Sequence, residues 1–286
     1  MAASDIAVAR TIEGLRHTVA DWRRSGERIG LVPTMGAIHA GHLALVAAVR
    51  ERGARAVASL FVNPKQFGPN EDFAAYPRHE AADLAAFARA GVDLVFAPPV
   101  AEMYAPGFAS NIHVGGVSEG LCGGQRPGHF DGVATVVTKL LLQTQPDFAC
   151  FGEKDYQQLT VVRRLVRDLD IPVEIVGVPT VREADGLALS SRNAYLSPEE
   201  RRIAPRLYRT LRDAAAAIQA RPNAIEASLD RGRASLSEAG FKLDYLELRD
   251  AETLVPMTTL TPPARLLAAA YLGRTRLIDN IPIERR

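Results

Sequence analysis

The sequence predicts an α/β protein, in which a parallel sheet with helices on both faces precedes a smaller α+β domain. Two observations predict this class. Through about the first 180 residues, short apolar runs alternate with longer amphipathic stretches, at a spacing typical of β–α–β units. After Pro179 this alternation gives way to two long helical patterns followed by strand candidates. We therefore expect one domain at residues 1–180 and a second at 181–286.

The elements of the first domain follow from hydrophobic period and turn residues. Runs rich in β-branched and aromatic residues predict strands at 29–32, 56–62, 92–97, 147–151 and 173–178. Apolar positions at helical spacing predict helices at 43–50, 79–90, 133–142 and 157–169. Gly53, Gly91 and the Pro98-Pro99 pair supply the breaks between these segments. Strands in this order form a parallel sheet, whose ligand crevice lies at their carboxyl ends.

The second domain begins with a strong helix-start signal. Ser197 can cap the helix, Pro198 suits its first position, and Glu199 and Glu200 suit its first turn. We expect this helix to run to about Ala220. A second helix at 223–239 and strands at 243–248, 266–272 and 276–278 complete the domain.

Composition limits the function classes. The chain has 286 residues, 47% hydrophobic and 23% charged, with a formal net charge of +1. Near-neutrality argues against broad nucleic-acid binding. Cys122 and Cys150 fit no metal-binding pattern and favour a reducing compartment. The sequence has no signal-peptide core and no apolar run of 18 residues, so we expect a cytoplasmic enzyme without a membrane span.

The motif His39-Ala40-Gly41-His42 is the most informative feature. It lies where the strand at 29–32 leads into a helix, so it should face the crevice. The helix start offers backbone N–H groups and a positive dipole end, Gly41 permits close approach, and two imidazoles add donors. These features suit the phosphates of a nucleotide. Taken alone, the same four residues also fit a polar loop at a helix start.

Two other polar clusters have the same character. Gly152-Glu153-Lys154-Asp155 follows a strand and precedes a helix, so Lys154 can neutralise a phosphate oxygen. Leu189-Ser190-Ser191-Arg192-Asn193 follows the domain boundary and can cover a triphosphate. A solvated charged turn and a Ser/Asn turn are the alternatives when each cluster is considered by itself.

Single residues add weaker candidates. Gln66 and Gln158 can donate and accept hydrogen bonds, which suits a substrate with hydroxyl and carboxylate oxygens. The loop at 126–130 is either a lid or an ordinary connection that contains a satisfied histidine. Asp72 and Asp83 are acids that solvated helix faces often carry, which leaves a metal role as one interpretation.

Six stretches together resemble one family. The chain is similar to the pantoate–β-alanine ligases (pantothenate synthetases) over nearly its whole length, and the stretches that carry the resemblance are LVPTMGAIHAGH (31–42), FVNPKQF (61–67), RPGHFDGV (126–133), CFGEKDYQQL (150–159), VGVPTVREADGLALSSRN (176–193) and LIDN (277–280). The first stretch alone indicates only the wider nucleotidylyltransferase superfamily. The later five narrow the resemblance to the ligases.

The resemblance implies a Rossmann-like first domain, a carboxy-terminal lid domain and a homodimer formed through the first domain. It implies ATP-dependent joining of pantoate to β-alanine, with AMP and pyrophosphate released. Gln66 corresponds to a residue that binds pantoate and β-alanine, Gln158 to one that binds pantoate, and Asp83 to a magnesium position. The positions that correspond to ATP-binding residues are Met35, Gly36, Ala37, Ile38, His39, Ala40, Gly41, His42, Gly152, Glu153, Lys154, Asp155, Val181, Leu189, Ser190, Ser191 and Arg192.

The expected mechanism is a two-step adenylation. Pantoate attacks the α-phosphorus of ATP, and the amine of β-alanine then attacks the resulting pantoyl adenylate. No protein nucleophile is needed, because a carboxylate is already ionised at neutral pH. The catalytic residues are then His42, His39, Lys154 and Arg192, which stabilise phosphate charge with Mg²⁺. Two alternatives are an adenylyltransferase that acts on a phosphate and a non-catalytic nucleotide sensor.

Overall fold

The computed structural model describes residues 6–69, 71, 73–74, 76 and 78–283. Asp72, one of the acids considered from the sequence, lies outside the described residues. The chain divides into two compact units. The first unit contains residues up to Val114 together with 126–153 and 161–179. The second contains 115–125, 154–160 and the chain from Thr180 onward, so two segments inside the predicted first domain belong to it.

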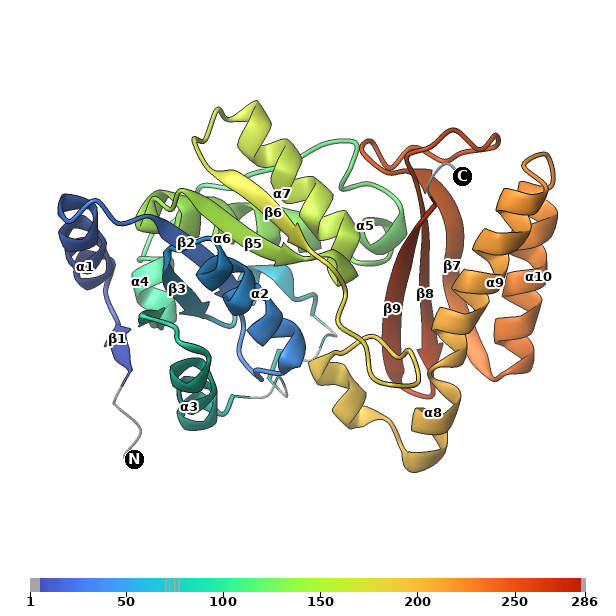
Figure 1. Cartoon of the computed structure of the whole chain (residues 1–286), viewed down its shortest axis with the longest axis horizontal. Helices are drawn as coiled ribbons and strands as arrows, with labels where there is room; N and C mark the ends of the chain where they lie inside the picture. Colours follow the sequence, from blue (N-terminus) through green and yellow to red (C-terminus); the bar gives the residue numbers. More distant parts are fainter. Residues whose placement is uncertain (1–5, 70, 72, 75, 77, 284–286) are drawn as a thin grey trace. The chain divides into compact units, whose positions relative to one another are not determined.

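The first unit is built on a parallel sheet of six strands, in the order β1-β4-β3-β2-β5-β6 (Figure 1). The strands are β1 (Ala7–Ala9), β2 (Ile29–Thr34), β3 (Arg55–Leu60), β4 (Leu94–Phe96), β5 (Phe148–Gly152) and β6 (Glu174–Val178). Successive strands β2, β3 and β4 step one way across the sheet, and β5 and β6 step the other way. The order reverses between β2 and β5, where open α/β sheets bind ligands at their carboxyl ends.

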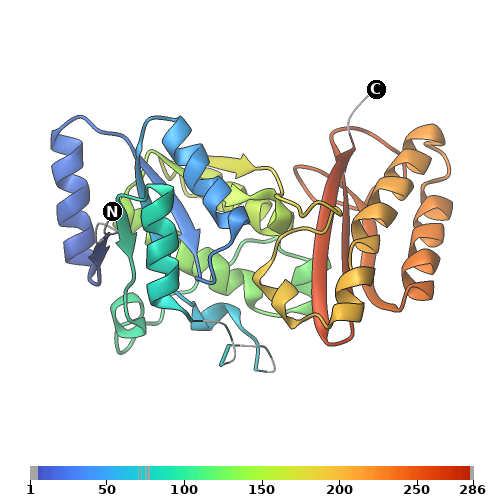
Figure 2. The same ribbon diagram turned by 60° about the horizontal axis from the view of Figure 1, so that its bottom comes forward.

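Helices cover both faces of this sheet. On one face, α2 (Ala40–Glu51) and α3 (Glu80–Ala90) pack side by side (Figure 2). Val46, Val49 and Phe87 are fully buried there. Helix α1 (Ile12–Arg24) packs against α6 (His129–Thr144). The short helices are η1 (Pro64–Gln66) and α4 (Val100–Met103), and α7 (Tyr156–Asp168) joins β5 to β6. These elements confirm the predicted parallel α/β sheet.

The sequence patterns did not predict β1 and α1. Thr11 caps α1, because its Oγ1 accepts a hydrogen bond from the N–H of Gly14 at 3.1 Å. Helix α6 also begins four residues before the predicted start, at His129, directly after Gly128 in a left-handed conformation. The start was missed because His129, Phe130 and Asp131 resemble the end of the preceding Gly- and Pro-containing loop.

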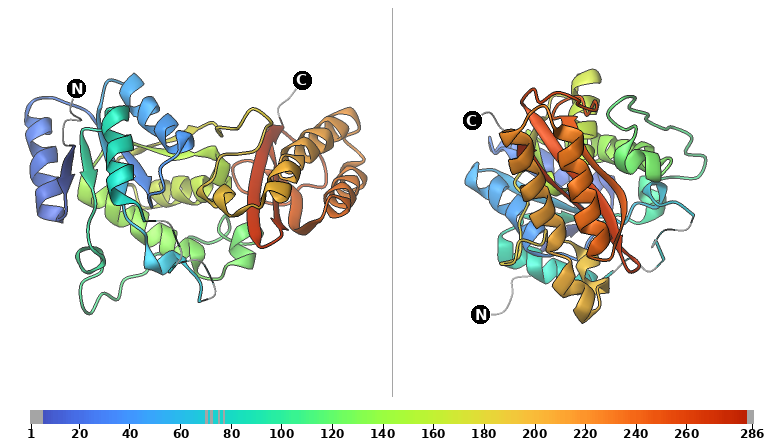
Figure 3. Two further views of the ribbon diagram at one scale, coloured as in Figure 1. Left: turned by 90° about the horizontal axis from the view of Figure 1, so that it is seen from below. Right: turned by 90° about the vertical axis from the view of Figure 1, so that its right-hand side faces the viewer.

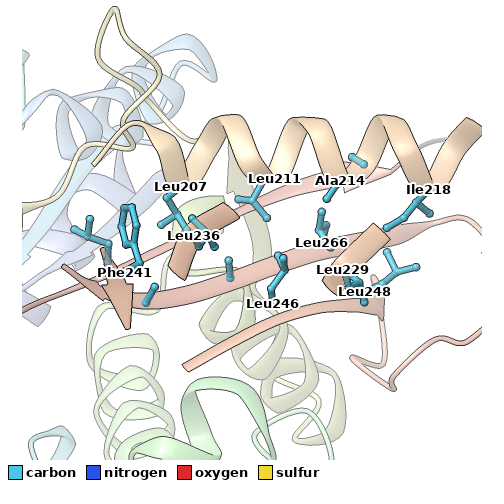
Figure 4. Packing of buried hydrophobic residues seen from close by; sticks show 14 of the residues in the cluster. Leu207, Leu211, Ala214, Ile218, Leu229, Leu236, Phe241, Leu246, Leu248 and Leu266 are labelled. Atoms are coloured by element: carbon cyan, nitrogen blue, oxygen red, sulfur yellow. The ribbon is translucent and has the colours of Figure 1, made fainter. Parts of the chain in front are cut away.

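The second unit contains an antiparallel sheet of β7 (Phe241–Asp250), β8 (Ala264–Leu272) and β9 (Thr275–Ile283), in that order. Helices α9 (Arg206–Ala220) and α10 (Ile225–Glu238) lie side by side along it (right panel of Figure 3). Leucines of α9 and α10 pack onto Leu246, Leu248 and Leu266 of the strands (Figure 4). This apolar layer explains the long helical patterns that the sequence showed.

The helix predicted from Pro198 to Ala220 is two helices. Helix α8 (Pro198–Ile203) ends before Pro205, and α9 begins at Arg206. Proline has no backbone N–H to continue a helix, which accounts for the break. The predicted start is confirmed, because Ser197 and Glu200 form reciprocal side-chain to backbone bonds.

The three strands of the second unit are longer than predicted. Strand β9 in particular contains Pro282, which edge strands tolerate because one side of the backbone needs no partner. The remaining short helices of this unit are α5 (Leu121–Gln125) and η3 (Ser191–Tyr195), and η2 (Glu153–Asp155) begins in the first unit and ends in the second. Among the described residues, every helix is too short or too polar to cross a membrane.

Candidate active site

The two histidines of the motif form the amino-terminal cap of α2. His39 is the N-cap residue, and its Nδ1 accepts a hydrogen bond from the N–H of Gly41 at 3.1 Å. His42 returns the bond, because its Nδ1 accepts from the N–H of His39 at 3.3 Å. The ring centroids are 4.1 Å apart, with 37° between the ring planes. The motif is therefore a capping box made of imidazoles, in place of the usual Ser and Glu.

This cap determines which ring nitrogen can donate. A neutral imidazole whose Nδ1 accepts a hydrogen bond carries its proton on Nε2. Both His39 and His42 are therefore Nε2–H donors in this arrangement, and both are half-buried. The N–H of His42 also donates to the carbonyl of His39 at 2.9 Å. The helix-start amides of Gly41 and His42 thus have partners in the chain, unlike the open amides that the sequence suggested.

Asp83 holds the loop that precedes the motif. Its Oδ1 accepts from the N–H of Ile38 at 2.9 Å, and its Oδ2 accepts from the N–H of Ala37 at 3.1 Å. Asp83 is 4% exposed, in the first turn of α3. Gly36 adopts φ +91°, and a Cβ there would lie 2.9 Å from Oδ2 of Asp83. A glycine is required at that point because the loop passes so close to the carboxylate.

These contacts do not fit a metal ligand. Each oxygen of Asp83 already accepts a backbone N–H, and a cation would have to compete with both bonds. Within the described part of the chain, no group of three or more His, Cys, Asp or Glu residues is arranged to hold a metal ion. We therefore assign Asp83 the positioning of the loop at 35–38.

Gln66 lies at the end of η1, and its amide is oriented by a buried asparagine. Asn63 is 1% exposed and Gln66 is 8% exposed. Asn63 Nδ2 donates to Gln66 Oε1 at 3.1 Å and to the carbonyl of Gly132 at 3.0 Å, and the hydroxyl of Tyr104 donates to Asn63 Oδ1 at 2.7 Å. Because Oε1 of Gln66 accepts from Asn63, its Nε2 is the side of the amide that a ligand oxygen can meet.

The RPGHFDGV stretch supports the same segment. A Cβ on Gly132 would lie 2.3 Å from the carbonyl oxygen of Lys65, so α6 can approach η1 this closely only with glycine there. Nδ1 of His129 bonds the carbonyl of Gln66 at 2.8 Å. Nη1 of Arg126 is 3.0 Å from Nε2 of His129. Since arginine only donates, Nε2 accepts and Nδ1 carries the proton.

Arg126 also forms an ion pair with Glu71, whose Oε1 accepts from Nε of the guanidinium at 2.6 Å. Burial raises the pKa of the Glu71 carboxyl more than any other single cause, but the hydrogen bonds and the charge of Arg126, with smaller contributions from His129 and the backbone of Gly68, together lower the pKa overall. His129 is therefore the satisfied histidine that one of the two alternatives for residues 126–130 predicted, and it supports Gln66.

In the second unit, Lys154 and Asp155 follow the end of β5. The Lys154 side chain is 19% exposed, and its Nζ lies 3.6 Å from Oδ2 of Asp155. Gln158 is half-buried on the next turn, whereas its neighbour Gln157 is 4% exposed. Gln157 Oε1 accepts from the N–H of Cys122 at 2.9 Å, so it fixes α5 and leaves Gln158 as the candidate for substrate contact.

Residues 181–192 form a hairpin and a 3-10 turn. The N–H of Leu189 donates to the carbonyl of Val181 at 3.0 Å, and Arg182 pairs with Ala188. Ser190 caps η3, since its Oγ accepts from the N–H of Arg192 at 3.2 Å. We call residues 181–192 the hairpin segment. The polar residues of the hairpin segment thus have a defined backbone conformation. An ordinary Ser/Asn turn, the alternative considered from the sequence, would have a defined conformation as well.

The cysteines have structural surroundings. Burial raises the pKa of the Cys150 thiol to about 11. Cys122 lies 3.1 Å from the hydroxyl of Tyr245 and is buried. Both are free thiols in the structure.

Sequence reasoning missed four residues that hold the candidate segments. Asn63 orients Gln66, and Arg182, Asp279 and Asn280 contact the segments of the second unit. Three of the six stretches that carried the resemblance contain these residues, so the signal was present. The sequence assigned these residues no role, because their contacts join positions up to 126 residues apart.

The chain matches the family model for pantoate-beta-alanine ligase over residues 7–282. The chain belongs to this family. It is 59% identical to the pantothenate synthetase of Paramagnetospirillum magneticum over 98% of both chains, and 61% identical to that of Rhizorhabdus wittichii over 97% of this chain and 98% of the relative. A crystal structure of pantothenate synthetase from Thermus thermophilus superposes with a TM-score of 0.92 at 49% identity, covering 98% of this chain and 100% of that one.

A second solved structure adds ligand information. The pantoate-beta-alanine ligase of Francisella tularensis, complexed with beta-gamma ATP and beta-alanine, has a TM-score of 0.80 and 34% identity, over 98% of this chain and 99% of that one. These matches confirm the family, the fold class and the ligase activity that the sequence motifs predicted. It also favours a ligase over the two alternatives, an adenylyltransferase acting on phosphate and a nucleotide sensor.

Proposed function

We propose that this enzyme joins pantoate to β-alanine through a pantoyl-adenylate intermediate, with ATP converted to AMP and pyrophosphate. The pantoate carboxylate attacks the α-phosphorus in line, the bond from that phosphorus to the bridging oxygen breaks, and pyrophosphate leaves. The amine of β-alanine, after losing a proton, then attacks the acyl carbon and AMP leaves. The imidazole capping box of His39 and His42 is the observation that carries the proposal.

The capping box supports a specific role for each ring. Because the Nδ1 atoms accept backbone bonds, the Nε2–H groups are donors whose orientation is set before ATP binds. Donors oriented in advance stabilise charge that grows on phosphate oxygens without reorganising in the transition state. The buried Asp83 supports this by holding the backbone of Ala37 and Ile38.

The remaining ATP contacts are proposed from the matching positions. Lys154 supplies a point charge to a phosphate oxygen, and Ser190, Ser191 and Arg192 supply donors to the departing pyrophosphate. Gly152, Glu153 and Asp155 complete one segment, and Val181 and Leu189 complete the other. Gln66 binds pantoate and faces β-alanine, and Gln158 binds pantoate. The first unit, which contains most of residues 1–180, binds the substrates, and the second unit, which contains residues 115–125, 154–160 and the chain from Thr180 onward, is a lid that excludes water from the anhydride.

Three further proposals concern the enzyme's setting. Bound Mg²⁺ would neutralise phosphate charge, and the ATP phosphates, not Asp83, would hold it, because both oxygens of Asp83 already accept backbone N–H groups. The free thiols Cys122 and Cys150 are consistent with a cytoplasmic location. A homodimer through the first domain is proposed from the family resemblance, and sedimentation equilibrium tests it.

One assay tests the function directly. ATP and pantoate without β-alanine should release pyrophosphate in an amount close to the enzyme present, with pantoyl adenylate retained. Addition of β-alanine should give sustained AMP formation. Pyrophosphate release that is independent of pantoate, or ATP binding without any release, would contradict the proposal. The first result would indicate another acceptor, and the second a sensor.

A further inference from the structure

We propose that Asp279 and Asn280, adjacent residues of β9, are positioning residues that hold Lys154 and the hairpin segment in place for adenylation. They belong to the LIDN stretch, to which the proposed function gives no role. The inference rests on the proposed function, because it assumes that Lys154 and the hairpin segment contact ATP. All of the residues involved belong to the second unit.

Asn280 holds the backbone of Lys154. Its Nδ2 donates to the carbonyl oxygen of Lys154 at 2.9 Å, and its Oδ1 accepts from Nε of Arg265 at 2.7 Å. Arginine has only donors, so it must meet the oxygen of the amide and thereby directs the nitrogen at Lys154. Asn280 is 3% exposed and Arg265 is 6% exposed.

The position of Arg265 is set in turn by Tyr156. The guanidinium carbon lies 4.0 Å from the centroid of the Tyr156 ring, and the Tyr156 hydroxyl donates to the carbonyl of Ala251 at 3.0 Å. Tyr156, which follows Lys154 and Asp155 along the chain, is thus fixed to the sheet of β7, β8 and β9. Both the carbonyl of Lys154 and the start of α7 therefore depend on β8 and β9.

Asp279 holds the hairpin segment through Arg182. The ion pair is bidentate, with Nη1 to Oδ2 at 2.6 Å and Nη2 to Oδ1 at 2.8 Å. Arg182 Nη1 also donates to the carbonyl of Gly186 at 3.1 Å, and its guanidinium carbon lies 3.8 Å from the ring centroid of Tyr208. Asp279 therefore holds one arm of the hairpin segment directly, through Arg182, and Arg182 in turn bonds the turn at Gly186.

Two adjacent strand residues suit this task. Successive side chains of a strand point to opposite faces of the sheet, so β9 can reach a different segment on each side. The N–H of Asn280 donates to Oδ1 of Asp279 at 2.7 Å, which ties the two anchors together. Displacement by about 1 Å of groups that contact the reacting atoms can cost about a hundredfold in rate. A shared anchor prevents such displacement between the two segments.

The test is Asn280→Asp, measured separately on the two half-reactions. The variant keeps size and an acceptor for Arg265, but sets an oxygen against the Lys154 carbonyl. Adenylate formation at saturating ATP should slow by about 10- to 100-fold, whereas turnover of supplied pantoyl adenylate with β-alanine should change less than about threefold. In a Lys154→Ala background, Asn280→Asp should have little further effect on adenylation, because it acts through Lys154.

A second variant and a matched control separate positioning from stability. Asp279→Asn should slow adenylation in the same way, and it carries the test if Asn280→Asp does not fold. Asp244→Asn breaks another half-buried ion pair of the same sheet, in which Nε of Arg276 donates to Oδ2 of Asp244 at 2.7 Å, and should lower the melting temperature without slowing adenylation. Equal slowing of both half-reactions, or slowing by Asp244→Asn as large as by Asp279→Asn, overturns the inference.

The outcome for Lys154→Ala alone distinguishes the two levels of proposal. If that variant forms adenylate at the normal rate, the assignment of Lys154 to ATP fails and the positioning role fails with it. If Lys154→Ala slows adenylation but Asn280→Asp does not, the proposed function stands and only the positioning role is wrong.

Discussion

The loop at 35–42 and the hairpin segment at 181–192 are both candidate phosphate-binding segments, yet they are held in different ways. Asp83 binds the first directly, through two backbone N–H groups, and the imidazoles close the helix cap. The hairpin segment is held indirectly, because Asp279 binds the side chain of Arg182, and Arg182 binds the carbonyl of Gly186 at the turn. The first segment is therefore held at its own backbone, whereas the second is held through one side chain, Arg182, which Asp279 and the Tyr208 ring fix in place.

The comparison indicates a division of roles. A segment that must present donors in one geometry benefits from a rigid backbone. A segment that must cover ATP and then release pyrophosphate can instead be held through a side chain, here Arg182 bound by Asp279. The four predictions below test this difference, beginning with the residue expected to matter most.

His42→Ala should reduce adenylate formation by about 10² or more, because it removes one transition-state donor and half of the capping box. Single-turnover formation of pantoyl adenylate, followed by rapid quench, measures it. His17→Ala changes an exposed histidine of α1 and should have no effect. A normal rate in the His42 variant, with the fold intact by circular dichroism, would remove the capping box from the mechanism.

Asp83→Ala should slow adenylation by up to about a hundredfold and also lower stability. It leaves two N–H groups without acceptors, at a cost of about 1–3 kcal/mol for each one that stays buried. Asp83→Asn retains one acceptor and should be intermediate. The measurements are single-turnover rates and thermal unfolding.

Asp93→Ala is the matched control for Asp83. Asp93 accepts from the N–H of Ala56 at 2.8 Å, but it lies at the amino ends of the strands, at the opposite edge of the sheet from the candidate site. It should lower stability without slowing adenylation of the folded enzyme. If both variants slow adenylation equally, the loop at 35–38 does not depend on Asp83 in the way we propose.

Gln66→Ala and Gln158→Ala should both weaken pantoate binding more than ATP binding, and Gln66→Ala should have the larger effect. Asn63 orients the Gln66 amide in advance, so less entropy is lost when pantoate binds. Titration calorimetry with each ligand measures this. Equal losses for pantoate and ATP would contradict the assignment to pantoate.

The smallest effect is expected from Asp185→Asn in the hairpin segment. The hydrogen bond from Arg201 lowers the pKa of the Asp185 carboxyl, so its contribution to stability is present above the ordinary Asp pKa of about 4 and is lost as pH falls through the lower folded-state value. The pair is about one-third exposed, so solvent screening limits this to under about 1 kcal/mol. Thermal unfolding of both proteins should differ slightly at pH 7, and the difference should shrink as the pH falls below the ordinary Asp pKa. A difference that grows in acid would have the wrong sign.

Local chemistry made much of the fold predictable. The helix start at Ser197-Pro198 was correct because capping uses only the next three residues. The predicted sheet was correct because its central strands consist mostly of apolar residues. The break at Pro205 was missed because the surrounding residues are good helix formers, and β1 was missed because three residues are too few to show a period.

The sequence by itself determined the family, the α/β class and the location of the His39–His42 motif at the end of a strand, since each follows from residues that are neighbours along the chain. Tertiary structure alone decided that Asp83 binds the loop at 35–38 and that β9 anchors Lys154 and Arg182. Those contacts join residues 45 to 126 positions apart. No local pattern encodes them, because a buried polar side chain acquires its partner only when folding brings distant backbone groups to it.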